Sequence, residues 1–144
     1  MVKSLPKNVQ DLFNDRAAVK VLSTHSPSSM HAVPLGSLVA ITPDLIVFGR
    51  GIYNKETHEN LQKAKANGEL VSALAVKGGT AYQVRVKPMD YQTSGPILDK
   101  IREALKPIFD QMKLNVNDLI IGVWTFQPVE IIDQGMGPNA GKKL

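Results

Sequence analysis

The sequence predicts a mainly β protein, a six-stranded antiparallel barrel with helices at its periphery. Short turns join neighbouring β-prone segments, as at Ser26–Ser29 and at Thr42–Asp44. Residues 80–91 alternate between apolar and polar side chains, which is typical of a half-buried strand. The helical segments separate hairpins rather than single strands, and this arrangement argues against a doubly wound parallel sheet.

The pattern predicts each element in turn. We expect a helix at 6–13, strands at 17–24, 30–41 and 45–50, a helix at 57–66, strands at 70–76 and 80–91, a helix at 94–112 and a last strand at 118–133. Pro34 should mark an edge, bend or bulge, because proline donates no ladder hydrogen bond. Thr57 and Ser94 are the expected N-caps. Pro107 should kink or break the third helix.

Length and composition limit the possible classes of protein. The chain has 144 residues, which suits one domain at 1–144, with an irregular tail at 134–144. The absence of cysteine excludes disulfides and thiolate metal sites. The apolar runs are far shorter than the roughly 20 residues of a membrane-spanning helix, and the N-terminus lacks an apolar signal core. We therefore expect a cytoplasmic protein without a membrane partner.

The positive charge is spread along the chain. The net charge is +4, and aromatic residues make up 6% of the sequence. Nucleic-acid-binding proteins usually gather basic and aromatic side chains in one patch. Nucleic acid is therefore not an expected partner, although a cofactor-free basic binding module stays open as an alternative.

Few side chains suggest chemistry by themselves. The three histidines, His25, His31 and His58, lack the spacing of a metal-binding motif, so no metal site is expected. His31 is interpreted as a strand residue rather than a catalyst. The serines lack the G-x-S-x-G context of a hydrolase.

Five short motifs occur in an order that is typical of one family. They are HAVPLGS at 31–37, KETHENL at 55–61, YQVRV at 82–86, TSGP at 93–96 and GPNAGK at 137–142. Together they resemble the FMN-binding split-barrel family that is related to pyridoxamine-phosphate oxidase, over nearly the whole chain. The resemblance implies a split barrel of the Greek-key type, with FMN as the cofactor at a homodimer interface.

The resemblance also implies a set of site residues. Arg50, Lys55 and Thr57 would hold the phosphate at a helix N-terminus, where free N–H groups favour anions. Glu56 stands where the family usually has Lys or Arg, so Lys55 or Arg50 would have to supply that charge. The alternative is an ordinary capped surface helix.

Further residues would contact the rest of the cofactor. Val33, Pro34, Leu35, Gly36 and Ser37 would offer backbone groups to the flavin ring, or they form an ordinary strand bulge. Asn60 would reach the ribityl chain or the phosphate, or it faces solvent. Trp124 is assigned to core or dimer packing rather than to flavin stacking.

The expected function is that of an oxidoreductase or electron carrier with a small-molecule or protein redox partner. No catalytic residue is assigned, because the cofactor performs the difficult chemistry in such proteins. Deazaflavin F420 or haem in the same fold is the nearest alternative.

Overall fold

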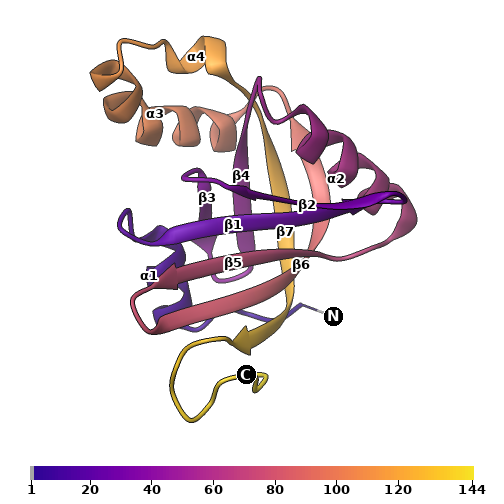
Figure 1. The fold of residues 1–144 in the computed structure, drawn as a ribbon. Coiled ribbons are helices and arrows are strands. Elements are labelled where there is room, and N and C mark those ends of the chain that lie inside the picture. Colours follow the sequence, from indigo (N-terminus) through magenta and orange to yellow (C-terminus); the bar gives the residue numbers. More distant parts are fainter. Residues whose placement is uncertain (1) are drawn as a thin grey trace.

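The computed structural model describes residues 2–144, which form one curled antiparallel sheet with helices around it (Figure 1). The strands are β1 (Val19–Ser26), β2 (Ser29–Pro34), β3 (Leu38–Thr42), β4 (Leu45–Gly51), β5 (Val71–Lys77), β6 (Thr80–Gln92) and β7 (Ile120–Asp133). The helices are α1 (Lys7–Asn14), α2 (Lys55–Asn67), α3 (Pro96–Gln111) and α4 (Val116–Leu119). The predicted mainly β fold with peripheral helices is confirmed.

The sheet has seven strands rather than six, in the order β2-β1-β5-β6-β7-β4-β3. The single strand predicted at 30–41 is wrong, because two strands, β2 and β3, occupy this stretch. Pro34 ends β2, where it pairs with Val21 on β1, and proline has no N–H to extend a ladder. The chain then leaves the sheet for three residues and resumes pairing on β4 at Leu38.

The connection between β2 and β3 closes the barrel. These two strands form the opposite edges of the sheet, yet only residues 35–37 join them. A link of this length spans about 14 Å at most, since the chain extends roughly 3.5 Å per residue. The sheet must therefore curl until its two edges approach each other. Figure 1 shows β1, β2 and β5 crossing β3, β4 and β7 at a steep angle.

Apolar side chains gather on both faces of the curled sheet. The larger cluster fills the barrel and includes Leu22, Phe48 and Phe126, all 0% exposed. A second cluster lies outside the barrel, where Val47 and Val123 pack against α3. This outer cluster holds α3 against the outer face of β4 and β7.

The helix ends differ from three of the predictions. The N-cap of α2 is Asn54 rather than Thr57, and the N-cap of α3 is Gly95 rather than Ser94. Pro107 does not break α3, which continues to Gln111. Phe109 packs against the outer apolar cluster after Pro107, and such packing stabilises a helical turn that local preference disfavours.

Burial along α3 decreases toward its C-terminal end. Leu98 and Ile101 are its buried residues, whereas Ile108 is 39% exposed and Met112, the C-cap residue, 53% exposed. The last strand also starts later than predicted, because α4 occupies residues 116–119. The side chain of Asn115 accepts a hydrogen bond from Asn117 N–H and caps this single turn.

The tail after β7 is irregular, as predicted, but it folds back on the strand. Lys143 forms an isolated bridge with Ile132, and its ammonium pairs with Glu130 at 2.6 Å.

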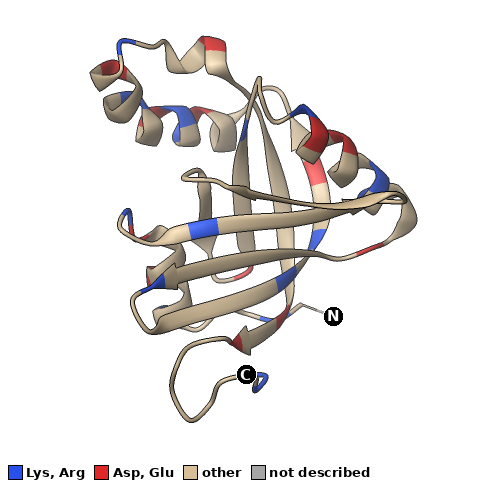
Figure 2. Ribbon diagram, in the orientation of Figure 1, with Lys and Arg blue, Asp and Glu red and all other residues tan. Residues whose placement is uncertain are grey.

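Figure 2 shows basic and acidic residues interspersed along α2 and α3. No helix within residues 2–144 is long and apolar enough to span a membrane.

Candidate functional site

The start of α2 is the position at which the sequence predicts a phosphate site. No side chain caps the first turn of α2, because the Asn54 side chain accepts a hydrogen bond from Gly51 N–H at 2.8 Å instead. The first N–H groups of a helix have no partner within the helix. Lys55, the first helical residue, is 80% exposed and lies 3.8 Å from Glu59. This turn therefore offers backbone donors and one exposed ammonium group.

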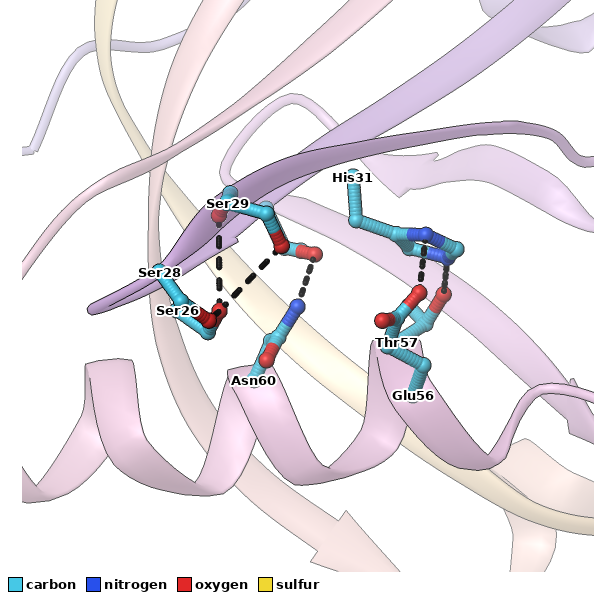
Figure 3. Close-up of polar contacts among 8 residues, drawn as sticks. Ser26, Ser28, Ser29, His31, Glu56, Thr57 and Asn60 are labelled. Carbon is cyan, nitrogen blue, oxygen red and sulfur yellow. Dashed lines mark hydrogen bonds and ion pairs between the residues drawn. The ribbon is translucent and has the colours of Figure 1, made fainter.

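His31 on β2 occupies the buried side of the same turn (Figure 3). Its Nε2 lies 3.0 Å from the hydroxyl of Thr57, and its Nδ1 lies 2.5 Å from the carboxylate of Glu56. Thr57 is only 1% exposed. The structure thus brings Lys55 and Thr57 to one turn but gives the Thr57 hydroxyl a partner within the chain.

Asn60 lies one turn further along α2 and points into the protein rather than to solvent. It is 4% exposed and donates a hydrogen bond to Thr24 Oγ1 on β1 at 3.1 Å. Figure 3 shows Asn60 and Thr57 facing the β1–β2 hairpin from the same side of the helix. Both residues therefore fasten α2 to this hairpin.

Arg50 on β4 belongs to an aromatic group at the end of the barrel. Its Nη1 donates to the hydroxyl of Tyr91 at 3.3 Å, and its Nε is buried without a hydrogen-bond partner in the described chain. The ring of Tyr91 lies 4.4 Å from that of His58 and 5.4 Å from that of Trp124. Arg50 therefore contacts Tyr91, whereas the Thr57 hydroxyl contacts His31.

The protonation of His58 follows from this setting. The indole Nε1–H of Trp124 donates to His58 Nδ1 at 3.0 Å, so this nitrogen carries no proton. Burial lowers the pKa of His58, the charge of Arg50 lowers it further, and Glu59 raises it. The neutral imidazole is favoured as a result. Trp124 is 1% exposed and packs in the barrel core, as the sequence analysis assigned.

The predicted ring-binding segment, Val33–Ser37, ends β2 and forms the link to β3. Val33 packs against the barrel core and Pro34 is exposed. Leu35 N–H donates to the carbonyl of Lys20 at 2.8 Å. The hydroxyl of Ser37 donates to the Gly49 carbonyl at 3.0 Å. Gly36 is exposed, and a Cβ on it would have no atom within 4 Å.

Two adjoining cavities lie between this link and α3. The first, which we name the α2-side cavity, measures about 290 Å³, and its lining includes Gly36, Ser37, Gly49, Asn54, Phe109 and Ile120. The second, the β3-side cavity, measures about 360 Å³, and its lining includes Asn14, Val39, Ile41, Lys100 and Ile101. Both are lined by Arg16, Lys20, Gly36, Ser37, Leu105 and Ile108.

The α2-side cavity extends from the predicted ring-binding segment toward the start of α2. It reaches from the link at Gly36 and Ser37 to Asn54, which directly precedes α2. Of the nine predicted residues, Gly36 and Ser37 line the cavities. Thr57, Asn60 and Arg50 contact other parts of the chain.

Sequence reasoning missed Lys20, although a signal was present. The inward positions of this stretch are 18, 20, 22 and 24, and Lys20 is the one charged residue among them. It is 6% exposed, and its ammonium donates to the carbonyls of Phe13 at 3.2 Å and Gly36 at 3.1 Å. A charged side chain at the inward position of a strand is uncommon enough to indicate a special role. Burial lowers the pKa of Lys20, and Asp15 raises it.

Comparison with known proteins places the fold. The structure resembles an FMN-binding protein from Syntrophomonas wolfei, with a TM-score of 0.71 and 16% identity over 89% of this chain and 84% of that chain. It also resembles a Lactobacillus delbrueckii protein that is provisionally assigned as a pyridoxamine 5′-phosphate oxidase, with a TM-score of 0.62 and 17% identity over 92% of this chain and 99% of that one. An F420 reductase matches with a TM-score of 0.61 and 12% identity, over 88% of this chain and 98% of that chain. No protein-family model and no curated protein sequence matches the chain.

These likenesses define the class of fold. The protein has the split-barrel fold of the flavoproteins that are related to pyridoxamine-phosphate oxidase. At identities of this size the likeness concerns the fold alone, so the ligand and the reaction have to be argued from the site.

Proposed function

We propose that the protein is an FMN-binding flavoprotein, an oxidoreductase or electron carrier that holds its flavin at a homodimer interface. The observation that carries this proposal is the course of the α2-side cavity, which reaches from the β2–β3 link to the residue before α2. A flavin mononucleotide needs this combination of an apolar slot for its ring and an anion site at the other end. The FMN-binding protein from Syntrophomonas wolfei has the same fold.

The lining of the cavity fits a flavin ring. Phe109, Leu105 and Ile120 supply apolar walls. The open space beside Gly36 lets a flat ligand approach the backbone closely, which a side chain at this position would prevent. The ring would therefore lie against the β2–β3 link.

The uncapped turn of α2 fits the phosphate. Its free N–H groups and the partial positive charge of a helix N-terminus favour an anion, and Lys55 adds an exposed ammonium. Glu56 in the same turn opposes a phosphate, but His31 pairs with its carboxylate. Thr57 and Asn60 would hold the helix in place and, through their hydrogen bonds, the turn that binds the phosphate.

Bound FMN would supply hydride or electron transfer at its ring. The chain itself would bind the cofactor, orient it and restrict water on the ring face that α3 covers. A second copy would cover the remaining open side, with equivalent sites related by a two-fold axis. The redox partner would be a small molecule or a protein.

The single tryptophan makes this proposal easy to test. Trp124 is the only tryptophan, so titration with FMN should quench its emission through energy transfer to the flavin. Gly36→Val should abolish this quenching while leaving the melting temperature unchanged, because the new side chain fills only the cavity. Gly137→Val is the matched control, since the tail glycine also has open space around it. Equal FMN affinity in both variants would overturn the ring assignment.

The phosphate end has its own test. Lys55→Ala should weaken FMN binding about tenfold, as expected for the loss of one charge-assisted contact. The control is Lys63→Ala, which removes an exposed lysine on the same helix and should leave FMN binding as in the wild type.

Measurement of the native mass should give a dimer. A monomer that leaves added FMN unbound would refute the proposed function.

Deazaflavin F420 is the second candidate, because an F420 reductase shares the fold. The visible spectrum of the purified protein distinguishes the cofactors. FMN gives two bands in the near-ultraviolet and blue, deazaflavin gives a single band near the violet, and haem gives a Soret band. A colourless protein that binds nucleic acid in a strongly salt-dependent way would instead indicate a basic binding module.

A further inference from the structure

The β3-side cavity carries an unbalanced positive charge that the flavin proposal does not use. Its lining contains three cations, Arg16, Lys20 and Lys100, and no aspartate or glutamate. None of these three cations forms an ion pair within residues 2–144. The nine pairs elsewhere in the described chain engage seven of the other fourteen lysines and arginines. The β3-side cavity is distinguished because three cations line it without an acidic residue.

Lys20 is the buried member of the group. Its ammonium is held by the carbonyls of Phe13 and Gly36, and Phe13 lies in the last turn of α1. Helix C-terminal carbonyls carry only partial negative charge. A buried charge without a full counter-ion is costly, so an anion brought to this ammonium would be stabilised. The carboxylate of Asp15, whose charge raises the pKa of Lys20, is itself bound to Lys77 at 2.6 Å.

The other lining groups determine the kind of ligand. Asn14 uses its amide on the edge of β3, where it binds both backbone groups of Ala40 at 2.9 Å. Ser37 already donates to the Gly49 carbonyl. The remaining walls are apolar and come from both β3 and α3; they are Val39, Ile41, Ile101, Leu105 and Ile108. The cavity thus combines one buried cation, two exposed cations and an apolar wall.

We propose that the β3-side cavity binds a small organic carboxylate with an apolar body. The carboxylate lies against Lys20, with Arg16 and Lys100 at the rim, and the apolar body packs on α3 and β3. Binding depends on this cavity alone. The role of the ligand as substrate rests on the proposed function, because the shared residues Gly36 and Ser37 would bring the ligand beside the flavin ring.

The test uses 2-naphthoate and its neutral analogue 2-naphthamide as probes, in calorimetric titrations of the full chain with and without FMN. Naphthoate should bind at least about tenfold more tightly than naphthamide, as one charge-assisted contact provides. The double variant Arg16→Gln/Lys100→Gln should lose part of this preference, because the rim charges add to the contact with Lys20. Lys63→Gln/Lys106→Gln removes the same charge from exposed positions outside the β3-side cavity and should keep the preference. Lys20→Met should abolish it, and the double variant reports on the site even if this buried substitution impairs folding.

The outcomes separate this inference from the proposed function. Equal affinity for the two probes in a protein that binds FMN would overturn the carboxylate site and leave the flavin assignment intact. A naphthoate preference in a protein that binds no FMN would support the site and refute the proposed function. Displacement of FMN by naphthoate would overturn a separate carboxylate site, because one ligand would then fill both cavities.

Discussion

Gly122 on β7 supports a prediction whose size follows from the structure. A Cβ at this position would lie 2.1 Å from the hydroxyl oxygen of Tyr91, 2.3 Å from its Cζ and 2.5 Å from its Cε1. Carbon atoms pack at about 3.5–4.0 Å, so Gly122→Ala forces the tyrosine ring to move by more than an ångström. Only glycine at this position allows Tyr91 to lie where Arg50, His58 and Trp124 contact it.

The loss of folding free energy caused by Gly122→Ala can be estimated in two ways. Overpacking of a fitted site costs about 1–3 kcal/mol. If the ring swings away instead, the protein loses the hydrogen bond from Arg50, about 1 kcal/mol, and the aromatic contacts of Tyr91, about 1 kcal/mol each. The first route gives a loss of about 2 kcal/mol and the second a loss of about 3 kcal/mol, which lowers the melting temperature of a chain of this length by about 4–12 °C.

The assay is urea unfolding followed by Trp124 emission, and the control is a double-mutant cycle with Tyr91→Ala. Removal of the ring removes the clash, so Gly122→Ala in that background should become neutral or stabilising by up to about 1 kcal/mol, because glycine weakens a strand relative to alanine. The coupling energy between the two sites should exceed about 1.5 kcal/mol. Equal losses with and without the Tyr91 ring would refute the argument.

Three further predictions concern charge and helix stability. The folded pKa of His58 is lowered, so its contribution to stability is present above the unfolded pKa of about 6.5 and is lost as the pH falls from there through the lower folded pKa. His58→Gln should therefore lose less melting temperature than the wild type between neutral and mildly acidic pH. Pro107→Ala should stabilise the protein by up to about 3 kcal/mol in urea unfolding, since proline inside a helix is disfavoured, whereas Pro96→Ala at the first turn should bring no such gain. The hydrogen bond from Lys77 lowers the pKa of Asp15, so Lys77→Met should raise that pKa in a carbon-detected NMR titration, and an unchanged value would contradict the assignment.

Local patterns in the sequence predicted the parts of the fold that depend on local physics. The alternation at 80–91 gives a strand with Val84 and Val86 buried and with Arg85 and Lys87 exposed. Pro34 was expected to disturb its strand, and it ends β2. The extent of that disturbance was underestimated, because the change of sheet edge after Pro34 depends on pairing with β1 and β4, which are distant in the sequence.

The site was harder to predict because its contacts are not local. Thr57 has the residue type of an N-cap, but its hydroxyl meets His31, 26 residues earlier in the chain. Arg50 stands near Lys55 in the sequence, yet inward orientation on β4 brings it to Tyr91, 41 residues away. Both cavities are formed where α3 packs on the outer face of the barrel. The sequence pattern of a helix predicts which of its own sides is apolar, but it does not predict which face of a sheet the helix will cover.

Barrel closure and the candidate site arise from the same three residues. Residues 35–37 carry the chain from one edge of the sheet to the other, so they cannot form ladder hydrogen bonds along their whole length. Backbone polar groups in such a link need other partners, and the Lys20 ammonium bonds to the Gly36 carbonyl, while the Lys20 carbonyl accepts from Leu35 N–H. The lysine that closes the barrel is therefore also the cation that faces both cavities. A ligand anion at Lys20 would bind the folded barrel and not the unfolded chain, so it should raise the unfolding temperature of the whole barrel once its concentration exceeds its Kd.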